Sequence, residues 1–227
     1  MAKRTLPKKP ASKRARILLV DDHPMVRERL REVIEREPDL MVCGEAEDRH
    51  EALAAIQNTK PDLVTIDLTL KSSHGLELVK DIRQRYPGLF MLVVSMHDES
   101  LHAERAIRAG AHGYITKQEA TRKILLAIRR VLGGELYLNE KIARQILAKR
   151  INHQSHDLSA SPLDCLADQE LRVFELTGQG LSIRQIASAL HLNVKTVETY
   201  RARTKQKLRL KDAAELLQFA IRWSSKP

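Results

Sequence analysis

Five times in succession between residues 17 and 132, a short apolar run precedes a segment whose apolar residues have helical spacing. The runs are rich in Val, Ile and Leu, as is typical of strands buried on both faces, and lie at residues 17–20, 41–46, 63–67, 90–95 and 113–116. Helices are expected at residues 24–34, 49–57, 76–82, 101–109 and 121–132. Since strands that alternate with helices pair in parallel through right-handed crossovers, the pattern predicts an α/β, doubly wound five-stranded parallel sheet.

The pattern changes after residue 132. Gly133-Gly134 interrupts it, and residues 133–164 are expected to form a linker with a helix near residues 139–149. Residues 165–227 predict a small all-α domain with helices at 168–178, 182–190, 194–208 and 212–223. Residues 1–16 carry seven Lys or Arg and two prolines, so they predict a flexible tail that either contacts phosphates or has no role. The expected segments are therefore 1–16, 17–132, 133–164 and 165–227.

The formal net charge of +10 is concentrated at the two ends of the chain. Residues 166–227 carry 11 basic and six acidic side chains, a balance that favours nucleic acid as a partner. No apolar run is long enough to cross a bilayer and no signal peptide is visible, so we expect a cytoplasmic protein without a membrane partner. Cys43 and Cys165 lie far apart in sequence and predict no disulfide.

Polar side chains follow three of the expected strands. Asp21 and Asp22 end the first strand, Asp67 ends the third, and Lys117 follows the fifth. The carboxyl ends of parallel strands share one edge of the sheet, where such sheets bind ligands. Clustered carboxylates repel one another unless a cation lies between them, and Mg²⁺ prefers oxygen ligands. We therefore expect a Mg²⁺ site at which Asp67 attacks a phosphorus atom, with Lys117 pairing to a phosphoryl oxygen.

These residues, with Ser95 closing the fourth strand, Tyr114, and Gly75 eight residues after Asp67, make residues 17–132 resemble the receiver domain of response regulators, which has a flavodoxin-like fold. The resemblance implies that Asp67 accepts a phosphoryl group from a phosphohistidine of a sensor histidine kinase. It implies metal ligation by Asp21, Asp22, Asp67 and the backbone carbonyl of Thr69. It also implies that Ser95, Tyr114 and Lys117 sense the phosphoryl group, which shifts a bistable element.

Two positions depart from the family pattern. Lys71 stands where a proline is common four residues after the acceptor, and Gln118 stands where a proline commonly follows the lysine. Neither change removes a reacting group. The lifetime of the phosphorylated state therefore stays open, while its formation is expected.

Residues 182–208 have the layout of a helix-turn-helix. A short helix with Ile183 and Ile186 inward precedes a three-residue turn and a longer helix, of which Val194 and Val197 are expected to pack inside. Between residues 195 and 211 there are seven basic side chains and one acidic side chain. A solvated helix usually mixes its signs, so this bias predicts contact with phosphates.

Residues 166–223 resemble the LuxR-type DNA-binding domain over nearly their whole length. The resemblance implies that the long helix enters the major groove of DNA, with contacts from Lys195, Thr196, Glu198, Thr199, Tyr200, Arg201, Ala202, Arg203 and Lys205. Glu198 either accepts a hydrogen bond from cytosine N4, or pairs with Arg201 within the helix or acts as an orienting acid. Apolar residues on the last helix exceed the needs of a small core and are candidates for a homodimer face: Leu216, Leu217, Phe219, Ala220 and Trp223.

The two resemblances together make the chain similar to NarL/FixJ-type two-component response regulators. They imply a transcriptional regulator that binds double-stranded DNA as a homodimer, at least when phosphorylated or DNA-bound. No enzyme activity is expected beyond Mg²⁺-dependent self-phosphorylation and slow autodephosphorylation. One alternative is a phosphorylation-independent, receiver-containing DNA-binding or adaptor protein. Another is a phosphatase of the haloacid-dehalogenase type, which wants a second acid where this chain has Thr69.

Overall fold

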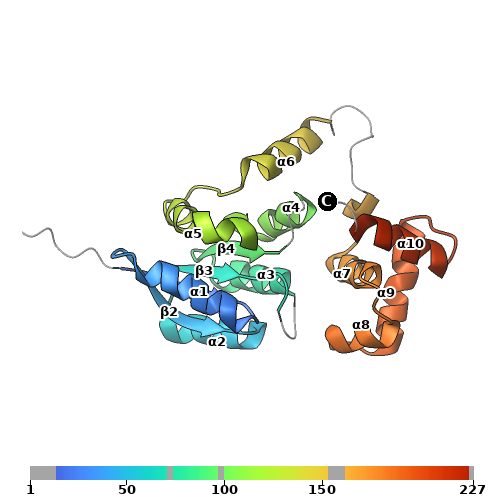
Figure 1. Cartoon of the computed structure of the whole chain (residues 1–227), viewed down its shortest axis with the longest axis horizontal. Helices are drawn as coiled ribbons and strands as arrows, with labels where there is room; N and C mark the ends of the chain where they lie inside the picture. Colours follow the sequence, from blue (N-terminus) through green and yellow to red (C-terminus); the bar gives the residue numbers. More distant parts are fainter. Residues whose placement is uncertain (1–13, 71–73, 97–99, 153–161, 225–227) are drawn as a thin grey trace, which may run out of the picture. The chain divides into compact units, whose positions relative to one another are not determined.

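The computed structural model describes residues 14–70, 74–96, 100–152 and 162–224, and the chain divides into two compact units. One unit is built on the sheet and ends at Asn139, and the other contains the helices from Glu140 onward (Figure 1). Lys71, residues 1–13 of the expected N-terminal tail and residues 153–161 of the expected linker lie outside the described residues. None of the described helices is both long and apolar enough to cross a membrane.

The first unit contains one parallel five-stranded sheet with the order β2-β1-β3-β4-β5, which confirms the predicted α/β fold. Its strands are β1 (Ala15–Val20), β2 (Leu40–Ala46), β3 (Leu63–Ile66), β4 (Phe90–Ser95) and β5 (Gly113–Thr116). The inner strand β3 is buried throughout. Its neighbours in the sheet are β1 and β4, so the residues that follow β1 and β3 come together at one edge.

Helices cover both faces of this sheet (Figure 1). They are α1 (Pro24–Glu35), α2 (Arg49–Thr59), α3 (Gly75–Arg85), α4 (Ser100–Ala109) and α5 (Lys117–Leu132). Contacts join α1 to α5 and α2 to α3, as in a doubly wound fold. A core cluster that includes Leu19, Ile34 and Ile128 fills the space beneath α1 and α5, and these three side chains are fully buried.

The helix after β5 begins four residues earlier than predicted, at Lys117 rather than Thr121. Thr116 caps it, because its side-chain oxygen accepts a hydrogen bond from the backbone N–H of Glu119. Apolar periodicity alone missed this first turn, whose residues are mostly polar. Lys117 is therefore fixed in a helical turn rather than carried on a loop.

The second unit is helical. Its elements are α6 (Glu140–Asn152), a short 3-10 helix (Pro162–Cys165), α7 (Asp168–Gly178), α8 (Ile183–Ala189), α9 (Val194–Lys207) and α10 (Ala213–Ser224). Leu163 is fully buried and packs with Leu166, Leu171 and Phe174, so part of the expected linker contributes to the core of this unit.

Side-chain caps fix the two helices of the predicted helix-turn-helix. The Ser182 hydroxyl accepts from the backbone N–H of Gln185 before α8, and Asn193 accepts from the N–H of Thr196 before α9. Val197 is fully buried, as expected, but Val194 is 41% exposed. The expectation that Val194 packs inside is wrong, because it occupies the first position of α9, ahead of the turn that faces α8.

Candidate functional site

Three carboxylates meet at the edge of the sheet where β1 and β3 end. Ligand atoms of Asp21, Asp22, His23 and Asp67 all lie within 4.8 Å of one another. Asp21 and Asp67 are almost completely buried. The structure thus brings together the carboxylates that the sequence placed at separate strand ends. It adds a residue that the sequence analysis missed, His23, which directly follows the acidic pair.

Lys117 joins two of these carboxylates. Its Nζ atom lies 2.7 Å from Oδ2 of Asp21 and 2.8 Å from Oδ2 of Asp67. The Lys117 side chain is only 9% exposed. Burial by itself lowers the pKa of Lys117, but attraction to Asp67 and hydrogen bonds to both acids outweigh burial and raise it. The ammonium group therefore stays charged inside the site.

The electrostatic balance at Asp67 is different. Burial raises the pKa of Asp67 to about 6, against the opposing effect of Lys117. The nearby carboxylate of Asp21 adds to the rise, and a hydrogen bond from the backbone N–H of Thr69 to Oδ1 of Asp67, 3.2 Å long, opposes it. Asp67 is thus a desolvated carboxylate whose charge is incompletely balanced, which suits a group that binds a cation.

The residues present fit a divalent cation. Oδ1 of Asp22 is buried and receives no hydrogen bond from the described residues, and the contact with His23 Nδ1 at 2.6 Å is an ion pair only when the imidazole is protonated. A buried carboxylate oxygen that receives no hydrogen bond and lies beside two other acids is a ready ligand for a hard cation such as Mg²⁺. Asp21, Asp22 and Asp67 would hold the ion. The structure brings the backbone of Thr69 against Asp67, where its N–H already contacts the acceptor carboxylate.

The backbone next to Asp67 is tightly packed against the start of α3. A Cβ atom added at Gly75 would lie 2.0 Å from the carbonyl oxygen of Asp67. The Gly75 N–H also donates to the carbonyl of Leu68, at 2.9 Å. Glycine is therefore required here because only a residue without a side chain allows the β3–α3 connection to close on itself.

Besides Lys117, the residues expected to sense the phosphoryl group lie on β4 and β5, the two strands that follow β3 in the sheet. Ser95 ends β4, and Tyr114 lies on β5, which pairs with β4 in register at Ser95 and Thr116. Both Ser95 and Tyr114 are fully buried. The tyrosine ring is thus already inside the protein in this state.

Five of the nine residues assigned to DNA contact form one exposed face of α9. Lys195, Glu198, Thr199, Ala202 and Arg203 are exposed. Within the described part of the chain neither Glu198 nor Arg201 forms an ion pair, so pairing with Arg201 and base contact both stay predictions for Glu198.

The remaining residues of that set are partly buried: Thr196, Tyr200, Arg201 and Lys205. Thr196 belongs to the cap of α9, and Tyr200 packs against the small core around Val197. Because of these structural roles, Thr196 and Tyr200 are less free to contact DNA than the exposed residues.

The candidate dimer residues on α10 divide into two groups. Leu216 and Ala220 are buried and belong to the same core cluster as Leu171 of α7. They serve the core of their own unit, so they are unavailable to a second chain. Phe219 and Trp223 are partly buried against the same cluster.

Two apolar side chains of α10 do face solvent. Leu217 is 38% exposed and Ile221, which was not among the candidates, is 43% exposed. A dimer face on α10 would therefore use the Leu217–Ile221 side of the helix, because these residues are one helical turn apart.

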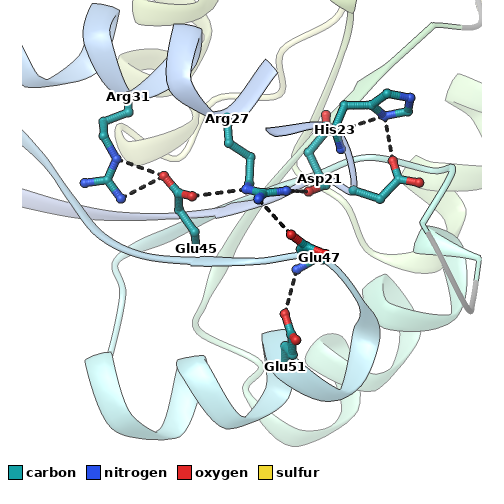
Figure 2. Close-up of polar contacts among 8 residues, drawn as sticks. Asp21, His23, Arg27, Arg31, Glu45, Glu47 and Glu51 are labelled. Carbon is teal, nitrogen blue, oxygen red and sulfur yellow. Dashed lines mark hydrogen bonds and ion pairs between the residues drawn. The ribbon is translucent and has the colours of Figure 1, made fainter. Parts of the chain in front are cut away.

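A second residue missed by the sequence analysis is Arg27. It lies on α1 at 8% exposure and reaches the backbone carbonyl of Asp21, with Glu45 and Glu47 on its other sides (Figure 2). Helical periodicity treats an arginine as a solvent-facing residue, so only the fold reveals this contact.

Comparison with known proteins agrees with both units. The response regulator receiver domain matches residues 17–129, and the bacterial regulatory proteins of the luxR family match residues 164–220. The chain belongs to the response regulators that join a receiver domain to a LuxR-type DNA-binding domain.

Among relatives, the response regulator GacA of Pseudomonas aeruginosa is 32% identical over 207 residues, covering 91% of this chain and 95% of its own. The transcriptional activator protein ExaE of Pseudomonas putida is 36% identical over 205 residues, covering 90% of this chain and 95% of its own. A crystal structure of a LuxR-family two-component response regulator from Aurantimonas is 41% identical, with a TM-score of 0.58 over 61% of this chain and 99% of that one. RcsB of Salmonella typhimurium, at 22% identity, shares the fold with a TM-score of 0.69 over 92% of this chain and 98% of that one.

Proposed function

We propose that this protein is a transcriptional regulator whose DNA binding is switched by phosphorylation of Asp67 by a sensor histidine kinase. The observation that carries the proposal is the constellation of Asp67, Asp21 and Lys117 in one buried site. A carboxylate, a cation site and a fixed ammonium group are the components that phosphoryl transfer to an aspartate requires.

Asp21, Asp22 and Asp67 would hold Mg²⁺, which would supply positive charge against the incoming phosphoryl group. Asp67 supplies the carboxylate oxygen that forms the new bond to phosphorus, while the P–N bond to the phosphohistidine of the kinase breaks and its imidazole leaves. Lys117, which pairs with Asp67 at 2.8 Å beforehand, then binds a phosphoryl oxygen instead. The phosphoryl charge and the hydroxyl of Ser95 together shift the region around β4 and β5, where Tyr114 is packed. We expect no catalysis of a reaction on any other substrate.

The output in this proposal is double-stranded DNA bound by a homodimer in the cytoplasm. The basic, exposed residues of α9 support the DNA partner, since phosphate contacts dominate affinity for DNA. One solved structure of RcsB is bound to a promoter in the presence of a phosphomimetic, which supports the same arrangement of input and output.

The test compares wild type with Asp67→Asn for genomic DNA fragments retained on immobilised protein, each with and without Mg²⁺ and acetyl phosphate. The proposal predicts that the phosphodonor increases retention of a specific set of fragments by wild type alone. Equal retention by both proteins under both conditions would contradict a phosphorylation switch and favour a phosphorylation-independent DNA-binding protein. Retention should also weaken as salt increases, because phosphate contacts release counterions.

A further inference from the structure

Arg27 is a buried cation that the proposed phosphoryl transfer does not use. Its guanidinium group donates from Nη1 to the backbone oxygen of Asp21 at 2.5 Å, from Nε to Glu45 at 3.1 Å and from Nη2 to Glu47 at 3.0 Å (Figure 2). Burial by itself lowers the pKa of Arg27, but the hydrogen bonds and attraction of the two glutamates outweigh burial and raise it. The side chain is therefore permanently charged and has a partner on each side.

The two glutamates connect Arg27 to a wider frame, the network of polar contacts that also includes Arg31 and Glu51. Glu45 lies on β2 and also pairs with Arg31, whose Nη2 is 2.7 Å from Glu45 Oε1. The backbone N–H of Glu47 donates to Glu51 at 2.9 Å, in the first turn of α2 (Figure 2). The guanidinium plane is thus held by Asp21 after β1, by Glu45 on β2 and by Glu47 between β2 and α2, and a planar group held at three points has one orientation.

What this frame holds is the backbone of the acidic pair. The Asp21 N–H donates to the carbonyl of Ala46 at 3.1 Å, and the Asp21 carbonyl accepts from Arg27. Hydrogen bonds therefore hold both the backbone N–H and the backbone carbonyl of Asp21, and the peptide that leads to Asp22 is fixed in orientation. Oδ1 of Asp21 additionally accepts from the backbone N–H of His23 at 2.9 Å.

We propose that Arg27 is a positioning residue for the divalent-cation site, acting through the backbone carbonyl of Asp21 rather than by touching the ion. This inference rests on the proposed Mg²⁺ site. Groups that orient metal ligands typically change metal affinity by about 10–100-fold when they are removed. Arg27 has this relation to the Asp21–Asp22 pair, whose carboxylates must stay close together against their mutual repulsion.

The chain offers a matched control. Arg31 is on the same helix and shares Glu45 with Arg27, but its described contacts do not reach the acidic pair. Arg31→Gln removes the same charge and an ion pair to the same glutamate, while the bond from Arg27 to Asp21 stays. A purely structural role for the network would make the two substitutions similar in their effect on the cation.

The experiment measures the Mg²⁺ dissociation constant of the full-length protein by isothermal titration calorimetry, well below the unfolding temperature. We expect Arg27→Gln to weaken Mg²⁺ binding about tenfold or more and Arg31→Gln to change it less than about twofold. Arg27→Lys keeps the charge and the fold, but one ammonium group cannot reproduce the three-way fork, so binding should also weaken. If Arg27→Gln does not fold, the Mg²⁺ dissociation constant of Arg27→Lys tests the positioning role instead.

The experiment distinguishes a failure of the proposed Mg²⁺ site from a failure of the positioning role of Arg27. Wild-type protein that does not bind Mg²⁺ would overturn the proposed cation site itself. Wild-type protein that binds Mg²⁺, with Arg27 variants indistinguishable from Arg31→Gln, would overturn the positioning role alone. In metal-free protein, the ¹³C shift of the Asp21 carbonyl should change in the Arg27 variants and not in Arg31→Gln; an unchanged shift would contradict the direct contact.

Discussion

The ammonium nitrogen of Lys117 lies 2.8 Å from Oδ2 of Asp67, although these residues are 50 positions apart in sequence. The contact places a fixed positive charge beside the carboxylate that we propose as the phosphoryl acceptor. Its second partner, Asp21, lies at 2.7 Å, so Lys117 can leave Asp67 for a phosphoryl oxygen without losing all of its pairing. Lys117 is therefore in place to exchange one negatively charged partner for another before any ligand binds.

Asp67→Asn should stabilise the metal-free protein at neutral pH. Burial raises the pKa of Asp67 to about 6, well above its value of about 3.8 in an unfolded chain. The folded state therefore binds this proton more tightly, and ionising Asp67 costs folding free energy. That cost is absent below about pH 3.8, grows as pH rises to about 6, and is complete above it.

An uncharged asparagine avoids this cost, so the gain should be about 1–3 kcal/mol near pH 7. Differential scanning calorimetry in EDTA, at pH 4.5 and pH 7.5, should show a difference in melting temperature that is larger at the higher pH. A difference that is larger at the lower pH would contradict the desolvation of Asp67.

Gly75→Ala should destabilise the receiver domain by about 1–3 kcal/mol, the range for overpacking. The new methyl group would meet the Asp67 carbonyl at 2.0 Å, so the β3–α3 connection must move. The control is Gly88→Ala, because a Cβ at Gly88 meets nothing within 4 Å. Urea unfolding followed by far-ultraviolet circular dichroism tests the pair, and equal midpoints would show that the connection is looser than described.

The ion pair between the buried Glu170 and the exposed Lys207 should make the DNA-binding domain less stable in acid. Burial raises the pKa of Glu170, but hydrogen bonds from Lys207, at 2.6 Å, and from the Ala167 N–H outweigh burial and lower it. The ionised carboxylate thus contributes stability above about pH 4.5, its unfolded value, and this contribution is lost as pH falls through the lowered folded value.

Glu170→Gln should therefore cost about 1–2 kcal/mol near pH 7 and much less in acid. Fluorescence of the single tryptophan, Trp223 on α10, reports unfolding of this unit specifically. The exposed Glu140→Gln serves as the control and should leave the midpoint unchanged. A cost that persists undiminished in acid would contradict the charged pair.

Two residues of α9 should affect DNA binding in different ways. Lys195→Gln removes an exposed positive charge, so it should weaken binding to all sequences and reduce the salt slope by about 1. Glu198→Gln should change base preference, with about 1–3 kcal/mol of discrimination at one position. The control is Arg222→Gln on α10, and titrations against random and selected duplexes separate the effects. A Glu198 variant with unchanged preference would remove this residue from base recognition.

The sheet and the clustering of Asp21, Asp67 and Lys117 were predictable because parallel strands end at a common edge. Their positions follow from strand order alone, which the apolar runs reveal. Arg27 was not predictable in this way, since its burial depends on Glu45 and Glu47 from other elements. Contacts of this kind arise from tertiary packing and leave no periodic signal in the sequence.

The helical unit shows the same limit. The helix-turn-helix can be predicted from its capping residues and its apolar spacing, because both are local features of the sequence. The surplus of apolar residues on α10 favoured a dimer face, yet Leu216 and Ala220 complete the unit's own core. A small domain needs its terminal helix for burial, and composition cannot divide the residues of one helix between a core and a partner.

Mass spectrometry of the intact protein after incubation with Mg²⁺ and acetyl phosphate tests whether Asp67 accepts a phosphoryl group. We expect that wild type gains the mass of a single phosphoryl group, that EDTA prevents the gain, and that Asp67→Asn shows none. Wild type that stays unmodified, or Asp67→Asn modified to the same extent as wild type, would contradict this role of Asp67.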